Sequence, residues 1–580
     1  MPLRLLFTIF FFGLCTLVSA QTLTTPDHRT LPDRATAKWL QQLRAKALDT
    51  TDRSAILPPG AAIRGEQHFP YPVIFVHGLG GAADTWLAFA TQAVEWGWSY
   101  GGHLAYHLNS DGNHYTTGLA GGAKSDIRKI QGAEAAADFY LVNFHVDTEG
   151  KALAKGSQDP HLSNQAAIVK QGAAIADAVA DVLKVTGADK VILFGHSLGG
   201  LAIREYLQNP AGWPAPGQHR VAKYISAGTP HAGSDASPDR IKALIPGVDR
   251  KSDAVRDLRA TYAATGEQGI YLFGGVESFE VMDREDRFPY YTTDINCNGT
   301  AGESISGLNH KSLPRDLDFA TIIGKVEGRN DDGLVRQSSA QLQLLYGGLQ
   351  SESFYVTGVD ADALHTALPD YTTLNLNALD EPDYVDLAYT IRPNHYYNGY
   401  ISEQADDAEF GHTDYDEFAF TLGTRQPVQL QLDGLEQAAQ YSVVDPAKGQ
   451  LIEAGFVDGN LLTTARTYEP GTYVLEISAA PRPDGQPYAY GFRVRTKDAI
   501  VSGVDHRPAT ALSLSPNPAA DRFQLRGPDP MPARVRLINA LGQTLTTTVS
   551  PRGEVNVAGL TPGLYTVQLP SGVSRKLLKQ

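Results

Sequence analysis

Long apolar runs alternate with amphipathic stretches between about residue 65 and residue 385. The runs at residues 71–78, 138–147 and 189–197 are continuous and rich in β-branched residues, and similar runs follow at 223–230, 321–328 and 353–359. Residues 162–185 instead repeat apolar side chains at the 3.6-residue spacing of a helix. Continuous apolar strands separated by helices are typical of a mostly parallel sheet with helices on both faces. The pattern predicts an α/β domain over residues 65–385.

The pattern changes after residue 392. Short segments that alternate apolar and polar positions fill residues 393–498, with turn residues between them, which predicts an antiparallel β-sandwich. The runs DYDEFAFTL (414–422) and GTYVLEIS (471–478) resemble accessory sandwiches of secreted bacterial hydrolases, so carbohydrate binding and plain stabilisation both remain open. A second all-β segment, residues 510–580, follows a linker.

The first 20 residues have one arginine, an apolar stretch and a small-residue ending, Val18-Ser19-Ala20, which predicts a cleaved signal peptide. An uncleaved anchor is the alternative, although the apolar stretch is short for a bilayer span. Residues 21–64 are expected to form a short helix and a Pro-Gly linker. We expect no transmembrane helix in the mature protein, and no disulfide, because only Cys297 would remain.

The composition and charge of the chain exclude some classes of protein and partner. The chain has 580 residues, of which 42% are hydrophobic and 19% charged, as in soluble folded proteins, and its length predicts several domains. Its formal charge of −15 would repel nucleic acid, so no nucleic-acid partner is expected.

The last 70 or so residues carry four landmarks in order: Ser515-Pro516-Asn517-Pro518, the run 539–543, the turn Gly563-Leu564-Tyr565, and the basic end at 576–579. This arrangement resembles the type IX secretion sorting domain; a generic third sandwich is the alternative. The resemblance implies the type IX secretion machinery as a partner and a secreted, extracellular or cell-surface location.

The run Gly195-His196-Ser197-Leu198-Gly199 lies between a predicted buried strand and a predicted helix. A sharp turn at that point would expose the Ser197 hydroxyl above the sheet, with glycines allowing neighbouring segments to approach. The run resembles the nucleophile elbow of bacterial lipases and esterases with the α/β-hydrolase fold. Serine needs a histidine to take its proton and an acid to orient that histidine.

The order nucleophile, acid, base directs the search downstream of Ser197. The segment around Asn330-Asp331-Asp332-Gly333 resembles the acid-bearing segment of secreted lipases and indicates Asp332 as the acid, with Asp331 as the alternative. His365 follows the last predicted strand and is expected to be the base. His310 precedes the acid, and His395 and His412 lie at or in the sandwich, so these three compete poorly.

Two backbone N–H groups are expected to hold the oxyanion. One is that of Leu198, directly after the nucleophile. The other is that of Leu79, because His77-Gly78-Leu79 resembles the oxyanion segment of lipases. The run 228–234 also resembles a segment that lines such sites, and there His231 is expected to be a wall residue.

The sequence says less about which segment covers the candidate site and about whether the chain binds a metal ion. Residues 86–112 carry Trp86, Trp96, Trp98 and Tyr100, which either cover the site or pack in the core, and residues 234–319 form a second insertion that could cover it. Asp294, Asn296, Asn298 and Gly299 resemble the opening of a calcium loop, but Ile305 replaces its final glutamate. No cofactor is therefore required, no metal ligand is assigned, and a structural calcium remains open.

Together these features predict a secreted serine hydrolase that cleaves acyl esters, with triacylglycerols as the first expectation and an acyl-enzyme intermediate. Phospholipid, glycolipid or polyester hydrolysis by the same fold is the alternative. A third possibility is a surface adhesin on an inactive hydrolase scaffold. The oligomeric state is not predictable from these patterns.

Overall fold

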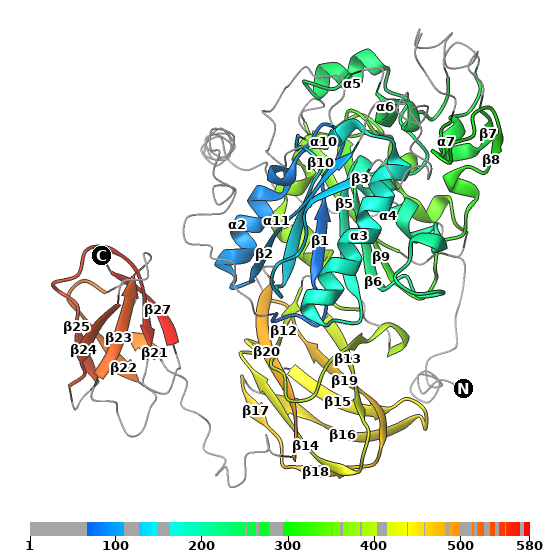
Figure 1. Ribbon diagram of the computed structural model, residues 1–580. Helices are drawn as coiled ribbons and strands as arrows, with labels where there is room; N and C mark the ends of the chain where they lie inside the picture. Colours follow the sequence, from blue (N-terminus) through cyan, green and yellow to red (C-terminus); the bar gives the residue numbers. More distant parts are fainter. Residues whose placement is uncertain are drawn as a thin grey trace.

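The computed structural model (Figure 1) describes the chain from Gln67 to Lys579 with gaps. The gaps lie at 109–126, 148–162, 250–251, 263–265, 278–293, 348, 350, 360–363, 383–384, 403–413, 438, 458, 483–486, 498–512, 516–518, 527–533, 540–543, 551–552 and 569–573. The predicted signal peptide and N-terminal helix therefore lie outside the described residues.

An eight-stranded sheet forms the centre of the first domain, in the order β10-β9-β6-β5-β1-β4-β2-β3. All neighbouring pairs are parallel except β2 and β3, which are antiparallel. The strands are β1 (Val73–Val76), β2 (Tyr100–Leu108), β3 (Ile127–Gln131), β4 (Phe139–Asn143), β5 (Val191–His196), β6 (Val221–Ala227), β9 (Asp318–Val326) and β10 (Glu352–Gly358).

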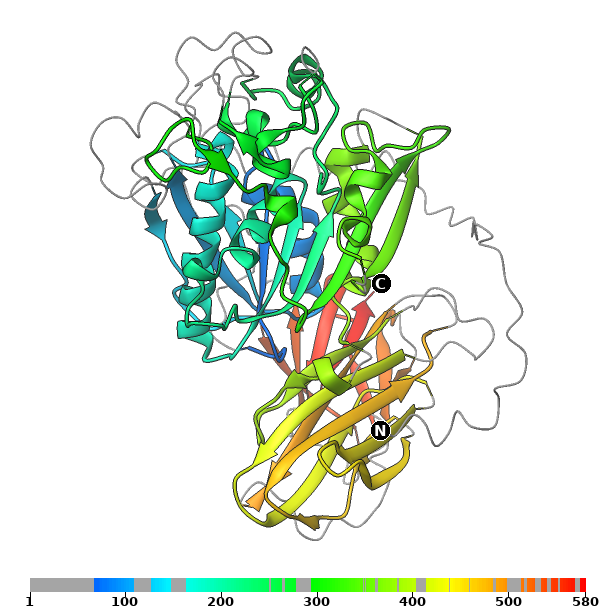
Figure 2. The same cartoon turned by 90° about the vertical axis from the view of Figure 1, so that its right-hand side faces the viewer.

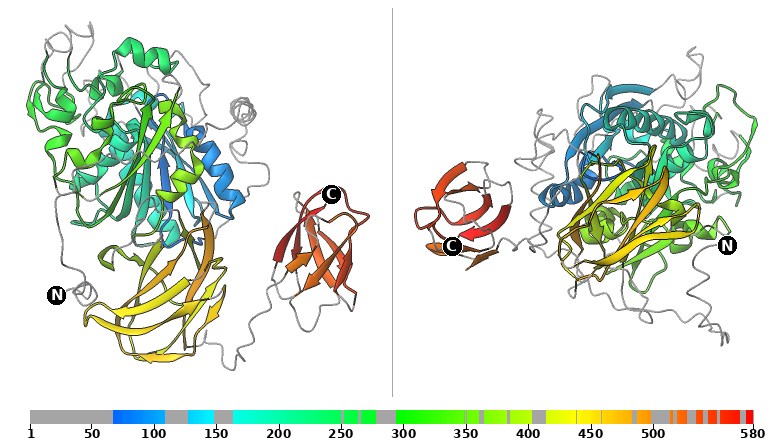
Figure 3. Two further views of the ribbon diagram at one scale, coloured as in Figure 1. Left: turned by 180° about the vertical axis from the view of Figure 1, so that it is seen from behind. Right: turned by 90° about the horizontal axis from the view of Figure 1, so that it is seen from below.

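Helices cover both faces of this sheet, as predicted (Figure 3). On β1, Phe75 belongs to one buried cluster and its neighbours Ile74 and Val76 to another, because successive side chains of a strand point to opposite faces. The first cluster includes helix α2 (Leu87–Glu95) and α11 (Thr372–Asn377), and the second includes α3 (Ile168–Thr186) and α4 (Leu198–Leu207).

The connection between β6 and β9 is long, and the elements described in it are short. They are α5 (Pro238–Leu244), α6 (Asp253–Asp257), α7 (Ile270–Phe273), and the two-stranded β7 (Gly275–Val276) and β8 (Ser304–Ile305). Two further short helices, α9 (Gln337–Ala340) and α10 (Leu364–Ala367), flank β10. Short 3-10 helices lie at Ala83–Trp86, Ser163–Gln165, Pro210–Gly212, Leu308–His310, Leu342–Leu344, Leu368–Asp370 and Val385–Leu387.

A β-sandwich follows directly, below the first domain in Figure 2. One sheet has the order β11-β13-β19-β15-β16, and the other has the order β12-β20-β14-β17 with β18 paired to β14. Its strands are β11 (Tyr389–Thr390), β12 (Tyr397–Ile401), β13 (Asp414–Leu422), β14 (Gln426–Asp433), β15 (Ala439–Asp445), β16 (Gln450–Val457), β17 (Leu461–Leu462), β18 (Arg466–Tyr468), β19 (Gly471–Ala479) and β20 (Tyr488–Thr496).

The sandwich and the α/β domain share one hydrophobic core. The indole N–H of Trp98 donates to the Tyr400 hydroxyl of β12 at 2.5 Å, and the rings of Phe69 and Tyr400 stack. Trp86, Trp98 and Tyr100 are buried in the same cluster and Trp96 packs against it. The possibility that these aromatic residues form a lid is therefore wrong: residues 86–108 supply α2 and β2, and their rings pack in the core.

The C-terminal domain is all β. Its strands form a three-stranded sheet, β21-β22-β25, and a four-stranded sheet, β24-β23-β26-β27. They are β21 (Ser513–Ser515), β22 (Arg522–Arg526), β23 (Arg534–Asn539), β24 (Thr544–Thr548), β25 (Glu554–Asn556), β26 (Gly563–Gln568) and β27 (Ser574–Lys579). Among the helices that the structure describes, none combines the length and apolar character needed to cross a bilayer.

Candidate active site

Ser197 lies in a strained turn between strand β5 and helix α4. Its φ of 53° and ψ of −125° are unusual for a residue with a side chain and cost about 1–3 kcal/mol. Backbone hydrogen bonds hold the turn: the Ser197 N–H donates to the Ala227 carbonyl at 2.8 Å, and the Gly200 N–H donates to the Ser197 carbonyl at 3.1 Å. The turn therefore holds the Ser197 side chain at the carboxyl end of the sheet.

Two glycines permit this turn. A Cβ on Gly195 would lie 2.5 Å from the Gly200 nitrogen, and a Cβ on Gly199 would lie 2.5 Å from the His77 carbonyl oxygen. Both distances are far below van der Waals contact, and the obstructing atoms belong to the backbone. The spacing Gly-x-Ser-x-Gly is thus a packing requirement of the strand–turn–helix unit at this position.

The structure brings Ser197, His365 and Asp332 into one hydrogen-bonded chain. The His365 Nε2 atom lies 2.9 Å from the Ser197 Oγ, and the His365 Nδ1 atom lies 2.7 Å from the Asp332 Oδ2. The other Asp332 oxygen accepts the backbone N–H groups of Leu334 at 3.0 Å and Val335 at 2.8 Å. The Asp332 carboxylate accepts a hydrogen bond from the Nδ1–H group of His365. The Nε2 atom then carries no proton and can accept the proton of the Ser197 hydroxyl.

The side chain of Asp331 points in a different direction from that of Asp332. Its carboxylate pairs with the Arg329 guanidinium at 2.7 Å and accepts the Gly333 N–H at 2.9 Å. The geometry therefore selects Asp332 over Asp331 as the partner of His365.

The other histidines lie elsewhere. His231 is fully buried, its Nε2 lies 3.1 Å from the Ser226 Oγ, and burial lowers its pKa well below the usual value. His310 ends a 3-10 helix of the long insertion, and His395 contacts the Gln67 carbonyl through Nε2 at 2.9 Å. His412 lies outside the described residues.

The predicted oxyanion segment lies beside the nucleophile. A Cβ on Gly78 would be 2.8 Å from the Ser197 Cβ, so the loop after β1 adjoins the turn after β5. Leu198 is the first residue of α4, where the N–H groups have no partner within the helix. Leu79 and Leu198 are both buried in the same cluster.

A neutral histidine fixes the shape of this loop. Burial lowers the pKa of His77 to about 4, so the imidazole is uncharged at neutral pH. Its Nε2 accepts the Phe144 N–H at 3.0 Å, and its Nδ1 therefore donates to the Gly78 carbonyl at 2.9 Å. His77 thus anchors the Gly78 peptide group, one residue before Leu79.

The long insertion covers the predicted oxyanion residues. Ile241 of α5 and Val248 pack with Leu79 and Leu198 in one buried cluster. A Cβ on Gly80 would lie 2.7 Å from Val248 Cγ2, so this contact is close. The α5 and α6 region lies above the carboxyl ends of the strands in Figure 1, and Ser197 is only 6% exposed. Of the two predicted covers, the second contacts the predicted oxyanion residues through its described part, at Ile241 and Val248.

Sequence reasoning did not single out His196 as a contributor. Its Nε2 lies 2.8 Å from the backbone carbonyl of His365, and burial lowers its pKa to about 3, so the ring is a neutral Nε2–H donor. Gly78 lies on the other side, since a Cβ there would be 3.2 Å from His196 Nδ1. His196 therefore sits between the base and the oxyanion loop. Its place within the elbow motif was the signal that could have identified it.

We expect His196→Phe to lower kcat about tenfold with little change in KM, because it leaves the buried His365 carbonyl without its donor. His196→Gln keeps a donor at a similar position and should recover most of the rate. Steady-state kinetics of the two variants measure this difference; equal rates for both would show that the hydrogen bond does not position His365.

The loop that resembles a calcium site is held by protein donors. The Asp294 carboxylate accepts the N–H groups of Asn298 at 3.0 Å and Gly299 at 2.7 Å, and the Glu277 carboxylate accepts that of Ile295 at 2.7 Å. Cys297 within the loop is buried and forms no disulfide within the described part of the chain. No cation is needed to explain this loop, and calcium binding there stays a prediction.

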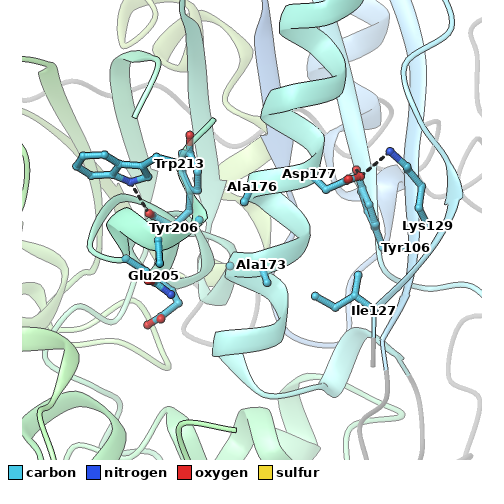
Figure 4. Close-up of a pocket in the computed structure, with 13 residues that line it drawn as sticks. Tyr106, Ile127, Lys129, Ala173, Ala176, Asp177, Glu205, Tyr206 and Trp213 are labelled. Atoms are coloured by element: carbon cyan, nitrogen blue, oxygen red, sulfur yellow. Dashed lines mark hydrogen bonds and ion pairs between the residues drawn. The ribbon is translucent and has the colours of Figure 1, made fainter. Parts of the chain in front are cut away.

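A surface hollow of about 450 Å³ lies between α3, α4 and strands β2 and β3 (Figure 4). It contains the ion pair between Lys129 and Asp177 at 2.8 Å, and the Trp213 indole donates to the Tyr206 carbonyl at 3.0 Å. The candidate triad does not line it.

Comparison with known proteins identifies two domains. Residues 69–301 match the PGAP1-like alpha/beta domain family, and residues 513–580 match the secretion system C-terminal sorting domain family. The chain thus combines an α/β-hydrolase domain with a type IX sorting domain and is a secreted or cell-surface protein. The predictions of fold, sorting domain and location are confirmed.

Solved structures give weaker likenesses. The propeptide form of the lipase BlEst2 from Bacillus licheniformis has 16% identity, with 89% of this chain and 94% of that chain covered and a TM-score of 0.27. The naproxen esterase from Bacillus subtilis has 10% identity, with 60% and 98% covered and a TM-score of 0.25. The pre-peptidase C-terminal domain of a Bacillus anthracis collagenase has 17% identity, with 20% and 99% covered and a TM-score of 0.16. These scores are too low to extend the assignment. No curated protein matches the sequence.

Proposed function

We propose that this protein is a secreted serine hydrolase that cleaves carboxylic ester bonds through an acyl-enzyme intermediate. The observation that carries the proposal is the hydrogen-bonded chain Ser197–His365–Asp332 on an α/β-hydrolase sheet. In this proposal His365 takes the proton from the Ser197 hydroxyl as its oxygen attacks the acyl carbon. Asp332 stabilises the imidazolium that results.

The remaining steps use the same groups. The backbone N–H groups of Leu79 and Leu198 would stabilise the oxyanion of the tetrahedral intermediate. His365 then returns the proton to the leaving alcohol, and water releases the acyl group by the reverse sequence.

The apolar cover favours a lipid acyl ester as the substrate. Ile241 and Val248 pack over the predicted oxyanion residues, and Leu244 and Ile245 pack against the same cluster. Apolar side chains at this position suit a hydrocarbon acyl chain better than a small polar ester. Triacylglycerols are therefore the first candidates, and phospholipids, glycolipids and polyesters share the same ester chemistry.

Two measurements test this proposal. A fluorophosphonate probe should label the wild-type chain at Ser197, since such probes report an activated serine; absence of labelling on folded protein would favour a non-catalytic binding protein. Turnover of soluble and emulsified esters of increasing acyl length should then rise with chain length and with emulsification. Highest activity on short soluble esters would overturn the choice of a lipid substrate.

A further inference from the structure

Three acidic side chains meet where the α/β domain joins the sandwich. Asp380 and Glu381 follow helix α11, and Asp416 lies on strand β13. Each offers one carboxylate oxygen, and these oxygens all lie within 4.8 Å of one another. All three residues are buried. Carboxylates this close, away from water, cannot all ionise unless positive charge compensates them.

Lys223 supplies positive charge beside Asp380, and it divides that charge between two partners. The Lys223 ammonium of β6 donates to the Asp380 backbone carbonyl at 2.8 Å, but it also pairs with Asp318 at 2.8 Å. A fourth acid, Asp414, adds negative charge and accepts the Ser402 N–H at 2.6 Å. The ammonium beside Asp380 thus already has a carboxylate partner, Asp318.

One carboxylate oxygen of Asp380 lacks a donor within the described residues. The Asp380 Oδ2 accepts the Ser402 hydroxyl at 2.8 Å, whereas its Oδ1 has no hydrogen-bond partner in the described part of the chain. Asp380 is only 6% exposed, so water does not compensate freely. A buried carboxylate oxygen without a donor is costly, and a bound cation would remove that cost.

We propose that Asp380, Glu381 and Asp416 bind a hard divalent cation of the calcium type. Calcium takes carboxylate oxygens at about 2.3–2.6 Å, so two ligands can be up to about 5 Å apart, whereas magnesium at about 2.1 Å requires a tighter set. A small cavity of about 20 Å³ lies beside Asp380 and Glu381; apolar and aromatic side chains form most of its wall, and Asp416 is not part of it.

The cation would fasten the two domains together. Asp380 and Glu381 end the α/β domain, and Asp416 belongs to the sandwich. Lys223 lies near the start of β6, and Ser197 follows the end of the parallel neighbour β5, so the proposed site is at the opposite edge of the sheet from the nucleophile. Loss of the cation should therefore lower stability without altering the catalytic groups directly.

The test uses the full chain, dialysed against a chelator and then titrated with calcium chloride. Elemental analysis of the wild-type protein should find about one calcium per chain, and Tm should rise by several degrees at calcium concentrations well above Kd. Asp416→Asn and Glu381→Gln should each lose the ion and the calcium dependence of Tm. Asp445→Asn, on strand β15 of the same sandwich, is the matched control and should keep both, because its carboxylate pairs with Lys448 at 2.6 Å.

Terbium provides a second readout that does not need a folded variant. The Tyr490 hydroxyl donates to Asp416 at 2.5 Å, so terbium bound by wild-type protein should show tyrosine-sensitised emission that calcium suppresses. A wild-type chain that binds neither ion and has the same Tm with and without calcium would overturn the proposal and show that protons neutralise the carboxylates. Fluorophosphonate labelling should persist in the variants, which separates this outcome from failure of the proposed catalytic function.

Discussion

Replacing Ser197 with alanine is expected to lower kcat for p-nitrophenyl acyl esters by about 10⁶-fold. The substitution removes the oxygen that would form the acyl-enzyme, while the residual oxyanion donors and binding groups account for what activity is left. Alanine fits the space of serine, and the hydrogen bond to His365 is the one that the Ser197 side chain makes within the described part of the chain. The measurement is initial-rate kinetics together with the melting temperature of each protein.

The control for this variant is Ser226→Ala. Ser226 is also a buried serine of the same sheet, but its hydroxyl contacts His231 and not the candidate triad. Its loss should cost about 1 kcal/mol of stability and change the rate by no more than a few-fold. Ordinary turnover by Ser197→Ala, or equal losses in the two variants, would show that Ser197 is not the nucleophile.

The nucleophile turn could be predicted from the sequence because its requirements are local. A side chain on Gly195 or Gly199 would collide with nearby backbone atoms, and both glycines lie within two residues of Ser197. The alternation of strand and helix also follows from local hydrophobic patterns. Local patterns of residues therefore suffice to predict the fold class, whereas the order of the candidate residues along the chain was implied by the resemblance to α/β hydrolases.

The role of the tryptophans could not be predicted from local patterns. Trp98 owes its burial to Phe69 and to Tyr400, a residue 302 positions further along the chain and in another domain. A run of aromatic residues has the same composition whether it covers a site or fills a core. Its role therefore depends on the residues that pack against it. Strand β3 was missed as well; its five residues are mostly polar or half-buried.

The choice between Asp331 and Asp332 also depended on three-dimensional geometry. The two residues are adjacent and chemically alike, and the turn that contains them points one carboxylate toward His365 and the other toward Arg329. Because the two carboxylates point in different directions, replacing each aspartate with asparagine should have different effects on catalysis.

Asp332→Asn is expected to lower kcat by about 10⁴-fold, as the loss of the orienting carboxylate does in other enzymes with a serine triad. The amide oxygen can still accept the N–H groups of Leu334 and Val335, so the turn should fold. The amide cannot supply the negative charge that stabilises the imidazolium of His365, and its NH₂ group favours the wrong tautomer.

Asp331→Asn removes the ion pair with Arg329, whose side chain is 45% exposed, and should change kcat by no more than a few-fold. Initial rates at saturating ester, with the rate of fluorophosphonate labelling as a second measure, compare the two variants directly. If Asp331→Asn were the slower enzyme, the acid would be Asp331 and the hydrogen bond between Asp332 and His365 would not be the one used in catalysis. A large loss in Asp332→Asn alone instead links the elbow, the base and this turn into one catalytic unit, because only then does the carboxylate act through His365 on the Ser197 hydroxyl.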